Sequence, residues 1–215
     1  MRLYLASTSP ARLKTLRNAG VNPVLLSPGV DEEATAAAAG PLDGPGLVSL
    51  LARAKAEAVV GATVDGRPID GVILGGDSAF ELDGVLYGKP HRPEVARERW
   101  LAMRGRTGVL HSGHWVIDHR NGVAGEGVGE VCSTTVTFAA DMDDAEVDAY
   151  VATGEPLAVA GAFTIDSLGS AFITSVEGDP HAVVGLSVST VRSLLGRLGI
   201  RWTDLWTRPP ETPHS

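Results

Sequence analysis

The stretch over residues 71–90, GVILGGDSAFELDGVLYGKP, constrains the fold more than any other part of the chain. It opens with a continuous apolar run at 72–74, which is typical of a strand buried on both faces of a sheet. The Gly75-Gly76 pair follows and directly precedes Asp77. This pattern predicts a buried strand that ends at Asp77, so that the carboxylate lies at a site rather than in a turn.

The Asp83-Gly84 pair in the same stretch predicts a two-residue hairpin, because alternating runs flank it on both sides. The expected cross-strand pairs are Leu82 with Val85, Phe80 with Tyr87, and Ser78 with Lys89. Such a hairpin returns Lys89 towards Asp77, although an ideal ladder places the two side chains on opposite faces. An ordinary hairpin with one exposed ion pair would show the same pattern.

The composition is that of a globular protein, and 215 residues suit one domain, possibly of two lobes. We expect a single domain over 1–202 and a polar, frayed tail over 203–215. No apolar run approaches the roughly 18 residues of a membrane helix, and the N-terminus turns polar too early for a signal peptide, which predicts a cytoplasmic protein without a membrane partner. The net charge of −8 argues against a nucleic-acid polymer as partner.

The N-terminal residues predict an anion site. Residues 3–6 read as a short strand, and a serine-rich loop leads to a helix with Ser9 as its N-cap and Pro10 in its first turn. Free backbone N–H groups at such a helix start attract anions, and Ser7 and Arg12 lie close enough in sequence to contribute. A well-capped helix with a surface arginine is the alternative.

Lysine is rare in this chain, which holds fifteen arginines but only three lysines, Lys14, Lys55 and Lys89. The helical period over 47–60 places Lys55 on the apolar arc of that helix. A lysine there must either extend its ammonium to solvent or meet an anion.

The acidic triplet 31–33, which includes Glu32, reads either as a solvated loop or as a source of oxygen ligands for magnesium. Residues 34–46 are rich in alanine, glycine and proline, which predicts a mobile loop, with a lid as the functional alternative.

The rest of the chain predicts regular elements without an internal repeat. We expect helices over 93–103, from the Asp143-Asp144 cap to Val151, and over 188–198, an antiparallel strand pair at 109–118 and 131–139, and two further strands within 160–176. Three histidines near the first of these strands lack a matching acid or cysteine pattern, so we expect no metal site there.

Taken in order, the motifs resemble those of the Maf family of nucleoside triphosphate pyrophosphatases, across roughly residues 3–200. The matching stretches are LASTSPARLKTL, LARAKA, GDS followed by GKP, YVATGEPLAVAGAFTI and GDPHAVVGL. The resemblance implies an α/β fold with an elongated mixed sheet flanked by helices, two lobes around a central cleft, and often a homodimer. It also implies a nucleoside triphosphate as substrate and a divalent metal, Mg²⁺ or another such as Mn²⁺.

The resemblance assigns roles to individual positions. The proton-accepting aspartate of the family falls on Asp77, and its acidic loop residue falls on Glu32, so these two side chains would contribute to the metal site. The phosphate contacts of the family fall on Ser7, Ser9, Arg12, Lys55 and Lys89.

The chain departs from the family pattern at two positions. A second arginine commonly follows the first proline in the family, where this chain has Ala11. Members that hydrolyse dTTP and UTP usually read IQG where this chain reads Ile165-Asp166-Ser167. Asp166 is thus the candidate for base recognition, but an ionised aspartate cannot donate to a pyrimidine carbonyl as glutamine can.

These observations give the hypothesis that the protein hydrolyses a nucleoside triphosphate to the monophosphate and pyrophosphate, and so removes non-standard or excess nucleotides. Asp77 would act as general base on a water molecule, and the cationic side chains would stabilise charge on the phosphates. One alternative is a nucleotide-binding regulator of septum formation with little or no catalysis. Another is a phosphatase that releases orthophosphate stepwise.

Overall fold

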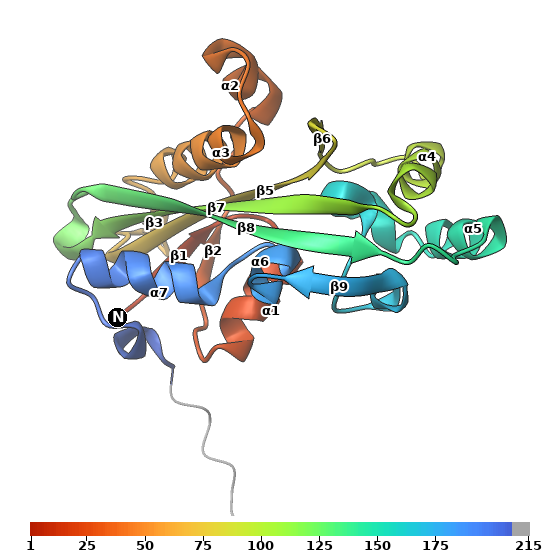
Figure 1. Cartoon of the computed structure of the whole chain (residues 1–215). Coiled ribbons are helices and arrows are strands. Elements are labelled where there is room, and N and C mark those ends of the chain that lie inside the picture. Colours follow the sequence, from red (N-terminus) through yellow and green to blue (C-terminus); the bar gives the residue numbers. More distant parts are fainter. Residues whose placement is uncertain (208–215) are drawn as a thin grey trace, which may run out of the picture.

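The computed structural model describes residues 1–207 and shows a mixed sheet of seven strands with helices on both faces (Figure 1). The strand order is β2-β1-β5-β7-β8-β9, and the short β6 pairs with β5. β1 runs parallel to β2 and β5, whereas the pairs from β5 to β9 and the β5–β6 pair are antiparallel. The predicted α/β class and mixed sheet are confirmed.

The strands are β1 (Leu3–Ala6), β2 (Val24–Leu26), β3 (Thr63–Val64), β4 (Arg67–Pro68), β5 (Gly71–Leu82), β6 (Val85–Tyr87), β7 (Thr107–His119), β8 (Gly127–Phe138) and β9 (Ile173–Glu177). The α-helices are α1 (Pro10–Asn18), α2 (Glu32–Ala39), α3 (Gly44–Ala58), α4 (Pro93–Met103), α5 (Asp144–Ala152), α6 (Pro180–Val184) and α7 (Val188–Arg197). Short 3-10 helices are η1 (Arg120–Gly122), η2 (Glu155–Ala158), η3 (Ala160–Ala162), η4 (Leu168–Phe172) and η5 (Trp202–Leu205).

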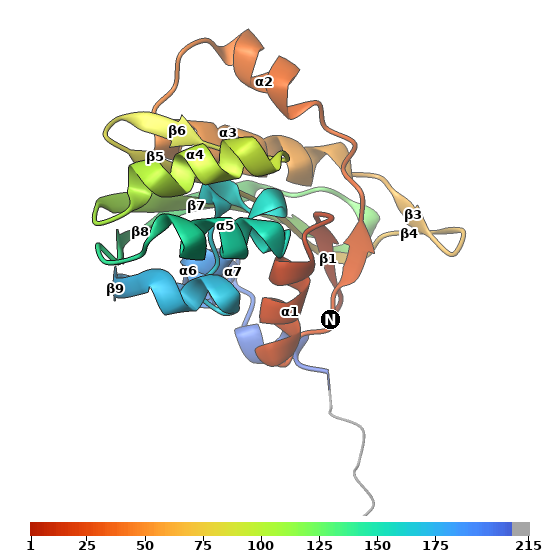
Figure 2. The ribbon, with the colours of Figure 1, turned by 90° about the vertical axis from the view of Figure 1, so that its right-hand side faces the viewer.

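The helices are divided between the two faces of the sheet. α3 covers one face of β5 and β7, while α6 and α7 pack against β7 and β8 on the other face (Figure 1). α4 and α5 lie side by side (Figure 2), at the end of the molecule remote from the N-terminus (Figure 1). No helix among residues 1–207 is both long and apolar enough to cross a membrane.

Asp77 lies in the middle of a strand, so the prediction that a strand ends there is wrong. β5 continues for twelve residues, and β7 pairs with it from Gly71 to Glu81. The opposite edge of β5 is shared by two short strands: β1 reaches only to Gly75, and β6 begins to pair at Phe80. What ends beside Asp77 is therefore the neighbouring strand, and residues 76–79 form an unpaired gap in that edge of the sheet.

The two glycines before Asp77 allow close contacts and do not break the strand. A Cβ atom on Gly75 would lie 2.1 Å from the carbonyl oxygen of Ala52 on α3, and one on Gly76 would lie 3.2 Å from Nε of Arg12. On β7, a Cβ atom on Gly113 would lie 2.3 Å from the carbonyl oxygen of Val48. Glycine at positions 75 and 113 thus lets α3 lie directly on the sheet.

We expect Gly75→Ala to lower the free energy of unfolding by about 3 kcal/mol, because the new methyl group meets a backbone carbonyl that cannot move without shifting α3. Gly196→Ala is the matched control, since the space around this helical glycine of α7 is open and alanine should stabilise the helix by about 0.5 kcal/mol. Urea denaturation of both variants measures the difference. Equal effects would contradict the account of Gly75.

The hairpin after Asp77 forms as predicted, but it is shorter. Asp83 and Gly84 both adopt positive φ angles, and the pairs of Leu82 with Val85 and Phe80 with Tyr87 are present. β6 ends at Tyr87, so the predicted pair of Ser78 with Lys89 does not form.

Residues 31–46 differ from the predicted solvated and mobile loops. Asp31 is the N-cap of α2 and accepts a hydrogen bond from the backbone N–H of Ala34, and the alanine-rich segment continues this helix. α3 begins at Gly44, three residues earlier than the predicted range. The helices predicted from 93, 143 and 188 are present as α4, α5 and α7.

Two predictions for the C-terminal half are wrong. Only one strand, β9, forms within 160–176, because residues 164–169 wrap around the carboxylate of Glu155 instead. The predicted tail from residue 203 begins inside η5, where Leu205 is buried in an apolar cluster. The remainder of that tail, residues 208–215, lies outside the described residues.

Three apolar clusters stabilise the sheet. One contains Leu74 and Val116 and lies under α7, and a second contains Ile73 and Ile117 on the α3 side. The third, around Phe80, is rich in aromatic side chains that meet edge to face, including Trp100 and Phe138. Residues 75–79 of β5 belong to none of these clusters, so the strand carries Asp77 between separate cores.

Candidate active site

Arg12 is fixed at the start of α1 by contacts to three separate segments. Its Nε donates to the carbonyl oxygen of Gly185 at 2.8 Å, and its two terminal nitrogens donate to the hydroxyls of Ser7 at 3.2 Å and Ser78 at 3.1 Å. Ser9 caps the helix as predicted, and its own N–H donates to Ser7 Oγ. The guanidinium is therefore held beside the gap in the edge of β5.

Lys55 reaches two carboxylates, which settles the alternatives left open by its position on the apolar arc. Its Nζ lies 2.6 Å from Oδ1 of Asp77 and 2.7 Å from Oε1 of Glu32. Lys55 and Asp77 are buried, whereas the Glu32 side chain is about half exposed. The structure thus brings together residues from α2, α3 and β5 that are far apart in the sequence.

Burial and the neighbouring charges shift the pKa values of Asp77 and Arg12 in this cluster. Burial raises the pKa of the Asp77 carboxyl above its ordinary value, while the charges of Lys55 and Arg12 oppose the shift. Burial likewise lowers the pKa of the Arg12 guanidinium, and the carboxylates of Asp77 and Glu32 oppose this. A raised pKa makes the Asp77 carboxylate a stronger base than an exposed aspartate.

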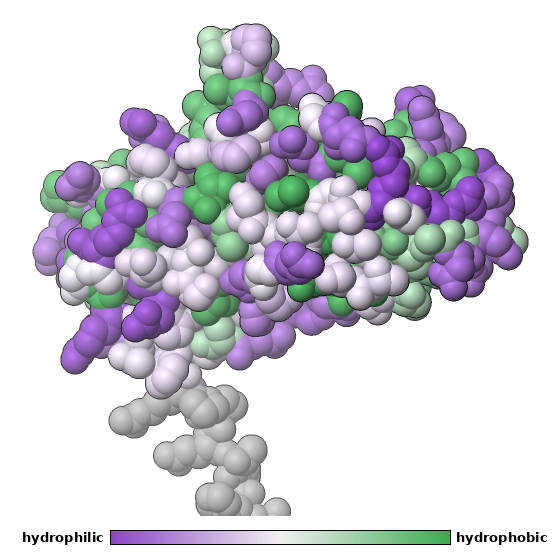
Figure 3. All heavy atoms as spheres, in the orientation of Figure 1, coloured by the Kyte–Doolittle hydropathy of each residue, from purple (hydrophilic) through white to green (hydrophobic). Residues whose placement is uncertain are grey.

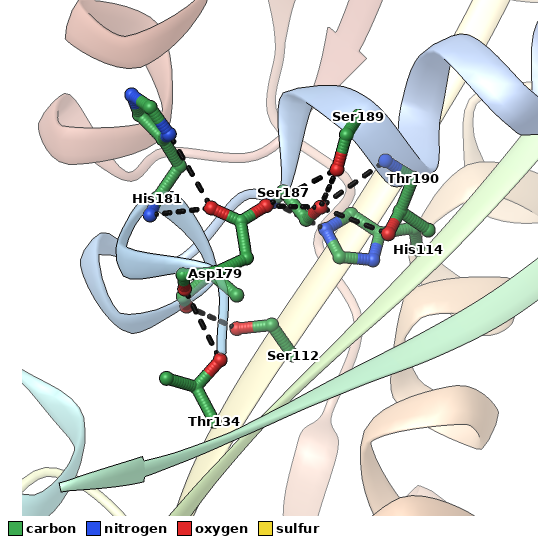
Figure 4. A network of polar contacts seen from close by, with 9 residues as sticks. Ser112, His114, Thr134, Asp179, His181, Ser187, Ser189 and Thr190 are labelled. Atoms are coloured by element: carbon green, nitrogen blue, oxygen red, sulfur yellow. Dashed lines mark hydrogen bonds and ion pairs between the residues drawn. The ribbon is translucent and has the colours of Figure 1, made fainter. Parts of the chain in front are cut away.

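A polar network behind Arg12 contains functional candidates that the sequence analysis missed (Figure 4). Ser112 lies 2.9 Å from Ser78 Oγ and donates to the carbonyl oxygen of Ala182 at 2.7 Å. Asp179, the N-cap of α6, accepts a hydrogen bond from Ser187 Oγ at 2.6 Å. This network fixes the turn at Gly185. The GDPH motif at residues 178–181 is the sequence signal that could have indicated the network.

His114 connects this network to β7. Its Nε2 accepts a hydrogen bond from the backbone N–H of Ser187 at 2.9 Å, so the ring is neutral and carries its proton on Nδ1. Burial and the nearby charge of Arg12 lower the pKa of His114 to about 4, although Glu130 and Asp179 act in the opposite direction.

The depressed pKa of His114 predicts a loss of stability in acid. His114 binds a proton more readily in the unfolded chain than in the folded protein. The contribution of the neutral imidazole to the free energy of unfolding is therefore fully present above pH 6.5, and it is lost as the pH falls towards about 4. We expect the free energy of unfolding to fall by about 3 kcal/mol over this window. Chemical denaturation at several pH values measures it, and His114→Gln should show a flatter dependence. An equally steep decline in that variant would refute the assignment.

Two predicted site residues lie outside the cluster. Lys89 is exposed in the segment after β6, and it has no hydrogen bond or ion pair to the other described residues. Asp166 is exposed as well, and its Oδ2 lies 3.0 Å from Nζ of Lys14 on α1. The structure therefore joins Ser7, Ser9, Arg12, Lys55, Asp77 and Glu32, and it leaves Lys89 and Asp166 apart from them.

The turn that carries Asp166 is built around Glu155. Its carboxylate accepts hydrogen bonds from Tyr150, Thr164, Ser167, Leu168 and Gly169. Although partial burial would raise the pKa of Glu155, these hydrogen bonds lower it to about 2. An ionised carboxylate therefore orders a segment that has few ladder hydrogen bonds of its own.

Within residues 1–207, no group of three or more histidine, cysteine or acidic side chains could hold a metal ion without further ligands. Glu32 and Asp77 nevertheless direct one oxygen each to a common cation, the Lys55 ammonium. Carboxylate oxygens are the donors that Mg²⁺ prefers, and substrate phosphates commonly complete its coordination. The residues present fit a divalent cation that is bound together with a phosphate ligand.

The fold and the site define an α/β protein in which a buried carboxylate of raised pKa lies beside a buried lysine and a buried arginine. The chain belongs to the Maf family: the family model described as Maf-like protein matches residues 2–198. It is 65% identical to a nucleoside triphosphate pyrophosphatase of Leifsonia xyli subsp. xyli, over 97% of this chain and 98% of the relative. Proteins with the same name from Nocardia farcinica and Salinispora tropica are 48% and 49% identical, over 96% and 99% of this chain and 97% and 90% of theirs.

Proposed function

We propose that this protein hydrolyses a nucleoside triphosphate to the nucleoside monophosphate and pyrophosphate, and so removes non-standard or excess nucleotides. Relatives that match nearly the whole chain are named nucleoside triphosphate pyrophosphatases. The observation that carries the proposal is the buried pair of Asp77 and Lys55 at the gap in the sheet edge, close to Arg12 and the start of α1. This arrangement supports the assignment of a base and of cations for the phosphates to one place.

Each side chain has a role in this reaction. Asp77 accepts a proton from the attacking water, because its carboxylate is the buried base of the cluster. Arg12, Lys55 and the Ser7 to Ser9 loop stabilise the negative charge that develops on the phosphates. Lys89 would join them from the exposed segment after β6.

Glu32 and Asp77 would hold the divalent cation, Mg²⁺ or Mn²⁺, together with phosphate oxygens of the substrate. When bound, the cation supplies charge neutralisation and lowers the pKa of a coordinated water. Lys55 would then contact phosphate oxygens in place of part of its contacts to Glu32 and Asp77.

Product analysis tests the proposal against its two alternatives. The enzyme, incubated with a panel of nucleoside triphosphates and Mg²⁺, should release pyrophosphate and monophosphate in equal amounts. Binding without turnover would support a nucleotide-binding regulator of septum formation instead. Stepwise release of orthophosphate would identify a phosphatase.

We further propose that Asp166 and Lys14 read the base together. A glutamine amide offers a hydrogen-bond donor and an acceptor. The Lys14–Asp166 pair offers both as well, because the lysine ammonium supplies the donor that the aspartate carboxylate lacks. The ammonium would donate to a carbonyl oxygen of uracil, and the carboxylate would accept from the neighbouring ring N–H.

We expect Lys14→Met to lower kcat/KM for UTP relative to CTP by roughly three- to tenfold, since both partners are partly exposed and their interactions are screened. The cytosine amino group can donate to Asp166 without the lysine. Steady-state kinetics with both substrates measure the ratio, with Arg17→Met on the same helix as control. An unchanged ratio would exclude Lys14 from base recognition.

We also propose that the enzyme acts in the cytoplasm as a homodimer. The outer edge of β8 pairs with β9 only from Thr135 to Phe138, so most of this edge has no strand neighbour among residues 1–207. Figure 3 shows paler and apolar residues across the middle of the face that carries β8, with hydrophilic residues towards both ends. A second copy could pair along this edge, and light scattering would give the oligomeric state.

A further inference from the structure

A cavity lies at the end of the sheet where β5 begins, remote from Asp77. It has a volume of about 940 Å³ and is bordered by β1, the β3–β4 hairpin and the connection between β7 and β8. Gly71, which lines it, lies six positions before Asp77 on β5, and this corresponds to roughly 20 Å along the strand. None of the predicted site residues lines this cavity.

Three arginines converge on the cavity in a protein of net charge −8. Arg120 is bound to the Asp118 carboxylate, with Nη2 to Oδ2 at 2.6 Å. Arg2 and Arg67 are exposed, and within residues 1–207 their guanidinium groups have no hydrogen bond or ion pair. Two planar guanidinium groups therefore remain available for a ligand with paired oxygens.

The acidic side chains of the cavity already have partners. Asp118 is engaged by Arg120, and Asp70 Oδ1 accepts a hydrogen bond from the backbone N–H of Asn121 at 2.8 Å. Among the described residues, no hydrogen bond or ion pair joins either carboxylate to Arg2 or Arg67. The lining side chains carry three positive and two negative charges, so the cavity is locally cationic.

Buried polar groups beside the cavity are incompletely hydrogen-bonded. The hydroxyl of Tyr4, a buried lining residue, accepts from the backbone N–H of Asp70 at 3.2 Å, and its own proton has no acceptor among the described residues. His119, which pairs with Gly71 in the ladder, is 2% exposed, and its Nδ1 has no partner in the described part of the chain. Buried polar atoms without a partner from the protein are uncommon, and each can hydrogen-bond to a ligand or to solvent.

We propose that this cavity binds a phosphate-bearing anion at a second site, distinct from the catalytic cluster. Arg2 and Arg67 contact the phosphate oxygens, and the Tyr4 hydroxyl donates to the ligand. Inorganic pyrophosphate and the phosphate of a nucleotide share this chemistry, so either could occupy the site.

Residue-resolved NMR titration of the full-length protein tests the proposal. Inorganic pyrophosphate and uridine monophosphate are titrated separately, and the amide signals of Gly71, Asn121 and Gly125 report on the cavity, whereas those of Ser9 and Gly185 report on the catalytic cluster. We expect saturable shifts in the cavity signals. Their apparent Kd should weaken by roughly tenfold or more in Arg2→Gln/Arg67→Gln, because two charge-assisted contacts are lost.

Arg192→Gln, which changes an exposed arginine on α7, is the matched control and should leave the Kd unchanged. Saturation by pyrophosphate indicates an inorganic source, and saturation by the monophosphate alone indicates a nucleotide source. Cavity signals that shift linearly with both anions, or an unchanged Kd in the double variant, would overturn the proposal. The measurement uses no turnover, so its outcome is independent of the proposed hydrolase activity.

Discussion

Asp77→Asn is expected to lower kcat by a factor of about 10² to 10⁴, the range that a general base contributes. Asparagine has almost the same shape, and its carbonyl oxygen can still accept the hydrogen bond that Lys55 donates to Asp77 at 2.6 Å. Nucleotide binding should therefore persist while proton acceptance is lost. The rate of pyrophosphate release measures kcat, and isothermal titration calorimetry measures nucleotide affinity.

Asp148→Asn is the matched control for this experiment. Asp148 is exposed on α5 and pairs with Arg97 at the far end of the molecule. The turnover of the Asp148→Asn variant should therefore remain close to that of the unmodified protein. If Asp77→Asn also retained near-native turnover, Asp77 would have no role as the base.

Lys55→Met is expected to change both the rate and its pH dependence. The lysine charge lowers the pKa of Asp77 and so opposes the effect of burial. Its removal should raise that pKa further, and the acid limb of kcat/KM should move to higher pH because the carboxylate must be ionised to act as base. We also expect a loss of about 10² or more in kcat/KM, since a cation at the phosphates is missing.

The pH profile separates this mechanism from a merely structural role of Lys55. Arg53→Met lies on the same helix, at an exposed position paired with Glu57, and should leave the acid limb in place. The titration of the Asp77 carboxyl carbon by NMR checks the pKa directly in the variant. An acid limb that stays where it was, or moves to lower pH, would contradict the coupling of Lys55 to Asp77.

Much of the site could be predicted because its residues carry local signals. Ser9 and Pro10 predict the start of α1, and the apolar arc of α3 predicts that Lys55 lies on its buried face. The partner of that lysine could not be read from the helix itself, since Asp77 lies 22 positions away. The same limit applies to Arg12 and Gly185, which are 173 positions apart.

Other features could not be predicted because one pattern fits several structures. Gly75 was interpreted as a strand break, yet the residue is needed for the close approach of α3, and only the packed fold distinguishes the two. The segment around Gly169 has the apolar composition of strands, but the Glu155 carboxylate competes successfully for its N–H and hydroxyl groups. In the alanine-rich segment after Asp31, the helix propensity of alanine outweighed the adjacent glycines and prolines.

The position of Asp77 between separate apolar clusters determines which parts of the chain can be substituted without loss of stability. Folding free energy is supplied mainly by the clusters on either side of residues 75–79, whereas the polar side chains at the site contribute little to core packing. Substitutions outside these clusters, such as at the exposed Asp166, are therefore expected to leave the protein folded. The fold separates the residues that supply most of its stability from those that form the candidate site.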